Sequence, residues 1–204
     1  MKKLLALLFS LFLLSSPSVF ADDISDFEIE GISIGDSLLD YMTEDEILKE
    51  IEENKDYYSD LNEPDKYLEI YTNKNLQTYA SLAFFIKNTP TSEYISNKNE
   101  KYLIVSIRGL IDFTEDFYGC IEKRDEIAED LSKVFPNAQK TEKNFEVSFD
   151  STIVDGVYFE FDSGGQGQVA CNDYKEPLRI KNNWIDNLSV SIKLAEVISW
   201  LKDY

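Results

Sequence analysis

The sequence contains no histidine. Histidine is the side chain that most often acts as a general base near neutral pH, and its imidazole is a common metal ligand. A chain without it cannot build a Ser-His-Asp triad or a histidine-based metal centre. Any catalysis would therefore depend on carboxylates, Lys or Tyr, and a glycosidase-like pair of acidic residues is one arrangement that the composition permits.

One short block nevertheless resembles a hydrolase motif. Residues 35–38 read Gly-Asp-Ser-Leu, the block after which the GDSL hydrolases are named, and residues 170–173 are similar to their later Gly-x-Asn-Asp block. Ala170 departs from the Gly of that pattern. Those enzymes also use a His to take the proton of the serine, and this chain has none. We therefore interpret Ser37 as part of a polar turn that leads into the first helix.

Basic residues are also scarce. The chain has 20 Lys and Arg against 39 Asp and Glu, which gives a formal net charge of −19 at pH 7. This charge repels phosphate backbones and anionic lipids, so we expect no nucleic-acid partner. Cations, neutral ligands such as sugars or peptides, and basic protein surfaces remain open as partners, and solubility alone is the simpler explanation of the charge.

No hydrophobic run is long enough to cross a membrane as a helix. The run Leu4–Leu14 has about eleven residues, whereas a spanning helix needs about 20. Two Lys residues precede it, and Val19 and Ala21 are small residues at the positions that signal peptidase reads. We predict a signal peptide over 1–21 and a single mature domain over 22–204. The mature protein is expected to be periplasmic or extracellular, with no membrane insertion after cleavage; an uncleaved N-terminal anchor is the alternative.

The chain has only two cysteines, Cys120 and Cys171. In a protein exported to an oxidising compartment, two cysteines are expected to pair. The bridge would close a loop of about fifty residues and contribute about 4 kcal/mol in the chain-entropy account. Two free catalytic thiols are the alternative, but no His is present to activate them. We expect a disulfide, no metal site and no cofactor.

Periodicity and turn residues predict the secondary structure. Thr43 and Glu46 form a capping box at the start of the first helix. Runs of strands with helices between them favour an α+β fold with a mostly antiparallel sheet and helices on one face, built from two α-β-β-β units. The expected helices are 44–54, 117–135 and 194–201, and the expected strands are 67–71, 79–87, 102–113, 145–149, 153–162, 168–173 and 187–192.

Three residues are candidates for ligand binding. Arg108 lies on a predicted strand, where it could pair with Asp112 or bind a carboxylate ligand. Tyr174 and Trp184 offer flat faces for sugars or hydrophobic partners. Core packing is the alternative for the aromatic residues, and Trp200 is expected to pack in the core through the apolar stripe of the last helix.

Longer blocks resemble a group of secreted proteins from marine bacteria. FEIEGISIGDSLLDY at 27–41 resembles the opening of that group, and KNNWIDNL at 181–188 is similar to one of its later blocks, as are the segments around Cys120, 157–161 and 171–174. The resemblance implies export but no function, because the group has none assigned. Residues 31–48 also resemble, loosely, the β-lactamase inhibitor protein type of fold, which implies a protein-binding or assembly module without catalysis.

These observations lead to one functional hypothesis and one alternative. We expect a non-enzymatic secreted domain that binds a protein or small-molecule ligand through its sheet surface. The alternative is a carboxylate-dependent hydrolase that acts on an extracellular polymer. A deep cleft with two facing carboxylates of perturbed pKa would favour the hydrolase, and a shallow aromatic face would favour the binding domain.

Overall fold

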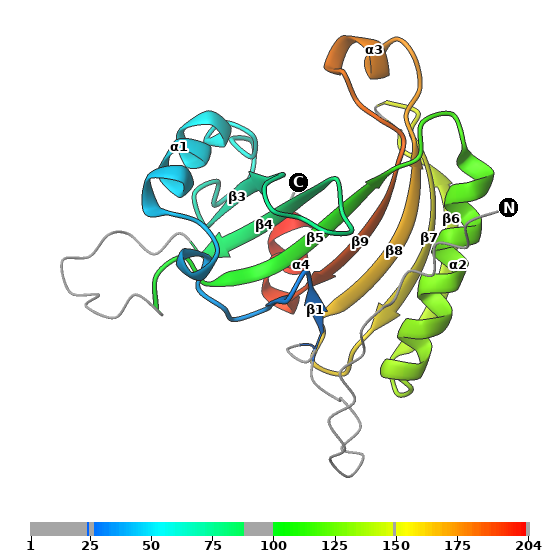
Figure 1. Cartoon of the computed structure of the whole chain (residues 1–204), viewed down its shortest axis with the longest axis horizontal. Helices are drawn as coiled ribbons and strands as arrows, with labels where there is room; N and C mark the ends of the chain where they lie inside the picture. Colours follow the sequence, from blue (N-terminus) through cyan, green and yellow to red (C-terminus); the bar gives the residue numbers. More distant parts are fainter. Residues whose placement is uncertain (1–23, 25–26, 88–99, 149, 203–204) are drawn as a thin grey trace, which may run out of the picture.

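The computed structural model describes residues 24, 27–87, 100–148 and 150–202. The predicted signal peptide lies outside the described residues. Seven antiparallel strands form one curved sheet in the order β3-β4-β5-β9-β8-β7-β6, and β1 and β2 form a separate short hairpin (Figure 1). The elements are β1 (Glu28–Ile29), β2 (Ile32–Ser33), the 3-10 helix η2 (Leu38–Asp40), α1 (Glu44–Asn54), β3 (Tyr67–Thr72), β4 (Ser81–Lys87), β5 (Ile104–Asp112), α2 (Phe117–Val134), β6 (Gln139–Glu146), β7 (Ile153–Glu160), β8 (Gln166–Asp173), α3 (Leu178–Asn182), β9 (Asn187–Lys193) and α4 (Ala195–Leu201).

The order of these elements confirms the predicted α+β class. Helix α1 precedes β3, β4 and β5, and helix α2 precedes β6, β7 and β8, so two α-β-β-β segments follow each other along the chain. Strand β9 pairs with β5 on one side and with β8 on the other. This last strand therefore joins the two segments into a single continuous sheet.

The two faces of the sheet carry different cores. The larger core contains Ile47 of α1, Leu131 of α2 and Phe84 of β4. The smaller core contains Phe85 of β4 and Trp200 of α4. Because successive residues of a strand point to opposite faces, the two cores lie on opposite sides of the sheet. Helices α1 and α2 share a face as predicted, whereas α4 packs on the other one, behind β5 and β9 in Figure 1.

Strand β5 departs from the alternation that the sequence predicts. The pattern places Val105 with Ile107 on one face and Ile104 with Arg108 on the other. In the structure Ile104 and Ile107 both belong to the larger core, and Val105 belongs to the smaller one. The register with β4 shifts at this point, as at a β-bulge, and an extra residue reverses the facing of the residues before it.

Two elements differ from the prediction. Strand β6 starts at Gln139, well before the predicted strand 145–149, and nearly all of its residues are exposed. As an edge strand it pairs only with β7, so it lacks the alternating burial that marks a strand in a sequence. The short helix α3 is not among the predicted elements.

Within the described part of the chain, no helix has the length and apolar character needed to cross a membrane.

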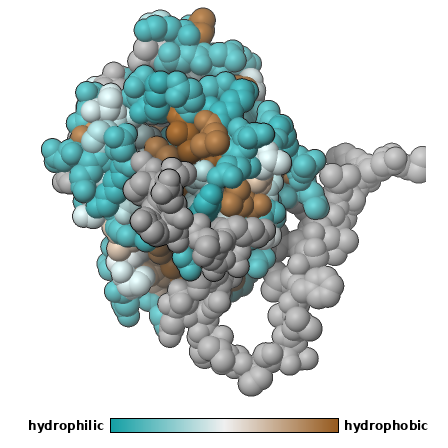
Figure 2. All heavy atoms as spheres, turned by 90° about the vertical axis from the view of Figure 1, so that its left-hand side faces the viewer, coloured by the Kyte–Doolittle hydropathy of each residue, from teal (hydrophilic) through white to brown (hydrophobic). Residues whose placement is uncertain are grey.

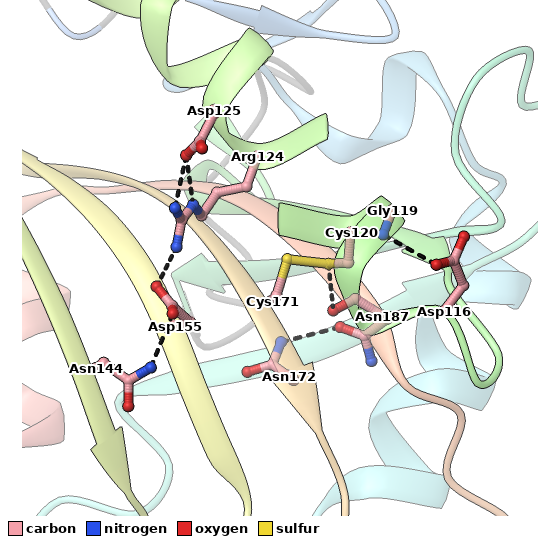
Figure 3. Close-up of a disulfide and its surroundings, with 10 residues drawn as sticks. All are labelled: Asp116, Gly119, Cys120, Arg124, Asp125, Asn144, Asp155, Cys171, Asn172 and Asn187. Carbon is pink, nitrogen blue, oxygen red and sulfur yellow. Dashed lines mark hydrogen bonds and ion pairs between the residues drawn. A yellow bond between two sulfur atoms is a disulfide. The ribbon is translucent and has the colours of Figure 1, made fainter. Parts of the chain in front are cut away.

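Helical spacing in the sequence predicts an apolar stripe on α2 that includes Cys120, Ala128, Leu131 and Val134, and the inner side of the helix is less apolar than this stripe. Cys120, Ala128 and Leu131 are buried as expected, but Val134 is exposed. Arg124 is also buried, at 8% exposure, and lies on the same side of the helix. Its guanidinium pairs with Asp125 and reaches the Asp155 carboxylate of β7 (Figure 3). An ion pair therefore forms part of the contact between α2 and the sheet.

The predicted disulfide is confirmed. Cys120 in the first turn of α2 is bonded to Cys171 of β8, and the two residues are 51 positions apart in the sequence (Figure 3). Both cysteines are buried in the larger core. The bond therefore ties α2 to the central strands.

The capping box at the start of α1 is also confirmed. The Thr43 hydroxyl accepts from the Glu46 amide at 3.3 Å, and the Glu46 carboxylate accepts from the Thr43 amide at 3.0 Å. The same carboxylate accepts from the Lys74 ammonium at 2.5 Å. These hydrogen bonds, that of Lys74 first, lower the pKa of Glu46 to about 2.

The stabilisation by Glu46 should depend on pH. A carboxyl whose folded pKa lies below its unfolded pKa of about 4.3 stabilises the fold above the unfolded pKa and loses that effect as the pH falls towards 2. We expect Glu46→Gln to lower the urea midpoint at pH 7 and the difference from the wild type to shrink between pH 5 and pH 2. Most of this dependence should vanish in a Lys74→Gln background. A difference that stays constant with pH would contradict the assignment.

Candidate functional site

The part of the sheet opposite α2 is polar where α4 does not cover it. Ser189 and Ser191 of β9 alternate with residues of the larger core, so they face away from α2. The register places Ser191 between Arg108 of β5 and Gln168 of β8. We call this surface the polar face. Its members, from β3 to β7, are Tyr71, Arg108, Ser189, Ser191, Lys193, Gln168, Ala170, Gly156 and Tyr158.

Small side chains form the floor of the polar face. Ser189 and Ser191 are only 5% and 2% exposed, and Ala170 is fully buried. A Cβ added at Gly156 would lie 2.9 Å from the Tyr158 ring and 3.1 Å from the Cβ of Ala170, so Gly156 leaves room for the Tyr158 ring against its own backbone. The floor is therefore screened by longer side chains of the face itself.

The Arg108 side chain lies on the same face of the sheet as these small residues. Its Nη2 donates to the Glu69 carboxylate at 3.0 Å and to the Tyr71 hydroxyl at 3.4 Å. Burial lowers the pKa of Arg108, but Glu69 and the hydroxyls of Tyr71, Tyr58 and Tyr174 outweigh that effect and raise it. The sequence suggested Asp112 as the ion-pair partner; in the structure the partner is Glu69, because β3 and β5 both flank β4.

Tyr174 and Trp184 lie together at the end of β8 and β9. Their ring centres are 5.0 Å apart. Asn187 donates to the Tyr174 hydroxyl at 3.5 Å, and the side chain of Trp184 remains partly exposed. Asn187 alternates with Ser189 and Ser191 along β9, so Tyr174 and its neighbour Trp184 lie beside the end of the polar face, on the same side of the sheet as Arg108.

Lys193 is a member of the polar face that the sequence did not single out. Its ammonium donates to the Gln168 side chain at 3.1 Å and to the Ser191 hydroxyl at 3.3 Å. Burial and the charge of Arg108 lower the pKa of Lys193 to about 8. The alternation of β9, which puts residues 189, 191 and 193 on one face, is the signal that could have identified it.

The serine of the Gly-Asp-Ser-Leu block has a structural role. Ser37 is 3% exposed, donates to the Lys101 carbonyl at 2.8 Å and accepts from the Leu39 amide at 3.4 Å. It is the N-cap of η2. This agrees with the prediction of a polar turn that leads into the first helix.

A hollow of about 340 Å³ lies beside α1. Hydrophilic residues dominate the side of the molecule that carries α1, and hydrophobic ones are gathered in small areas between them (Figure 2). The acidic groups of the hollow are engaged in the protein: Glu30 accepts from the amides of Gln77, Thr78 and Tyr79, and Glu46 binds Lys74. The hollow is lined by Glu30, Ile32, Asp40, Tyr41, Met42, Glu46, Thr72, Lys74, Asn75, Leu76, Leu82 and Phe84.

The hydrolase alternative would need a pair of facing carboxyl groups, one of which acts as a general acid. A general acid among carboxyl groups needs a raised pKa. At Glu44 and Glu46, by contrast, hydrogen bonds from Lys101 and Lys74 lower the pKa. In the described ranges, no group of three or more acidic or cysteine side chains is arranged to hold a metal ion.

Comparison with known proteins found no relative of this chain. The resemblance to secreted proteins of marine bacteria therefore stays a prediction. No protein-family model, no curated protein and no solved structure matches this chain.

Proposed function

We propose that this chain is an exported, non-enzymatic domain that binds a protein or small ligand through the polar face. The observation that carries the proposal is the uncovered part of the sheet, where small side chains form a floor between larger polar and aromatic ones. Tyr, Trp and Arg are the residues that most often dominate binding energy at interfaces. Tyr71, Arg108, Tyr174 and Trp184 contribute those types around one surface.

The polar groups of this face support binding rather than a purely structural role. A sheet face needs apolar residues to pack a helix, and Phe85, Val105 and Tyr67 supply them where α4 packs. The neighbouring rows instead carry Arg108 and Lys193. Because these groups gain nothing from burial against an apolar element, they are suited to a ligand or partner that brings its own polar groups.

Export is supported by two independent features. The predicted leader has the basic start, short apolar run and small cleavage residues of a signal peptide. The bond between Cys120 and Cys171 is typical of an oxidising compartment such as the periplasm or the extracellular space. Both features support an extracytoplasmic location, in which ligands and partners outside the cytoplasm would be available to the polar face.

Site-specific photocrosslinking in intact cells tests the proposal. We replace Tyr174 by the photoreactive p-benzoylphenylalanine, an aromatic residue that keeps most of the ring packing. The matched control carries the same residue at Tyr118 of α2, which is 86% exposed and belongs to the other side of the sheet.

The expected result is a defined crosslinked species from the exported fraction for the Tyr174 variant and none for the Tyr118 variant. Adding Trp184→Ala should lower the yield several-fold, because truncating a hot-spot aromatic costs about 2 kcal/mol or more. Equal crosslinking at both positions, or a product found only in the cytoplasm, would contradict the proposal.

A further inference from the structure

A pair of cations lies on the polar face, near the end of β9 that leads into α4, in a chain with a net charge of −19. Arg108 on β5 is opposite Ser191 of β9, and Ser106 is opposite Lys193. Arg108 and Lys193 are therefore diagonal neighbours on one face, about 7–8 Å apart at their backbones, which long side chains can span. Burial first, and then the charge of Arg108, lower the pKa of Lys193, in agreement with this register.

The acidic groups nearby do not neutralise both cations. Glu69 is the carboxylate of this region, and its two oxygens are used by Arg108 at 3.0 Å and by the Tyr58 hydroxyl at 2.8 Å. The two partners of Lys193, Gln168 and Ser191, are neutral. Within the described residues, no carboxylate lies within ion-pair distance of Lys193, so this part of the face has an excess of one positive charge.

We propose that Arg108 and Lys193 together bind a carboxylate group of the ligand. This inference rests on the proposed function of the polar face and specifies the chemistry that the face recognises. The ammonium of Lys193 and a free edge of the Arg108 guanidinium supply charged donors, which form the stronger class of hydrogen bond. The amide of Gln168 and the hydroxyl of Ser191 lie beside them as neutral donors.

The net negative charge of the chain limits the size and charge of the anion that can bind to this pair of cations. A polyanion such as a nucleic acid or a long acidic polysaccharide meets the repulsion of the entire surface. A single carboxylate meets only the local excess of one positive charge. Its source is either a free organic acid or an acidic side chain of a partner protein, and the two arms of the test distinguish these sources.

The experiment follows the Lys193 ammonium by NMR in the full mature protein labelled with ¹³C at the lysine Cε atoms. A spectrum of Lys193→Met assigns the signal. The probes are succinate in one arm and an acetylated Gly-Glu-Gly peptide in the other, with sodium chloride at equal ionic strength as the reference.

We expect succinate, the peptide or both to raise the pKa of Lys193 by about one unit or more, which corresponds to tenfold tighter binding to the protonated form. Binding should weaken above pH 8, as Lys193 loses its proton. Lys193→Met should bind the active probe about tenfold more weakly, whereas Lys123→Met on α2 should bind it as the wild type does. A response to succinate assigns the free acid, and a response to the peptide alone assigns a protein side chain.

The inference is overturned when neither probe moves the Lys193 pKa, when chloride moves it equally, or when Lys193→Met binds as the wild type does. Crosslinking at Tyr174 separates this failure from that of the proposed function. If crosslinking persists in Lys193→Met while the carboxylate response is absent, the polar face binds a partner without using this pair of cations.

Discussion

Replacing Cys120 and Cys171 together by alanine is expected to lower the free energy of unfolding by about 4 kcal/mol. The bond joins residues 51 positions apart, so its loss frees a long loop in the unfolded chain. It also joins the first turn of α2 to the central strand β8, and both cysteines are buried in the larger core. Urea unfolding followed by Trp fluorescence measures the change.

Reduction provides the matched control for this prediction. Dithiothreitol should lower the urea midpoint of the wild type towards that of the double variant and should leave the double variant unchanged. This comparison separates the loss of the covalent bond from the loss of sulfur packing. A midpoint that is the same in the wild type with and without reductant would show that the bond does not stabilise the fold.

Replacing Arg124 by methionine is expected to destabilise the protein by about 3 kcal/mol. The Arg124 side chain is 10% exposed and pairs with Asp155, whose other oxygen accepts from Asn144 at 2.8 Å. Without Arg124, the Asp155 carboxylate lies under α2 with no cation to balance it. Because Asp155 is 26% exposed, we expect the loss at the lower end of the range for broken buried pairs.

A second substitution tests the physical reason. In Arg124→Met with Asp155→Val, the unpaired charge is gone and a β-branched residue takes its place on a strand, so most of the lost stability should return. Lys123→Met, one position away, instead removes a partly exposed ion pair with Glu126 and should change the free energy of unfolding by less than about 1 kcal/mol. Additive losses in the double variant would contradict the role assigned to this ion pair.

The candidate site was predictable in part. Arg108, Tyr174 and Trp184 were recognisable because Arg and Trp are rare in this acidic chain and because Arg, Tyr and Trp are the residue types that most often dominate binding energy. Tyr71 and Lys193 were not, since each resembles an ordinary strand residue until its neighbours are known. The ion-pair partner of Arg108 was not predictable from the sequence either. Glu69 is on β3, two strands away in the sheet, and only the sheet order brings the two side chains together.

Local patterns determined much of the fold. The capping box of Thr43 and Glu46 and the alternation of β9 each involve a few neighbouring residues, and the two cysteines act through a single covalent bond. The sequence alone therefore specified α1, the disulfide and most strands.

Tertiary structure decided which face each strand presents and which strands meet. Three features depend on contacts between residues far apart in the chain. They are the pairing of β9 with β5 and β8, the register shift in β5, and the position of β6 as an exposed edge strand. A period of two marks two faces of a strand but not which one a helix covers. That choice is made when α2 packs on one face of the sheet, and it leaves Arg108 and Lys193 side by side on the other.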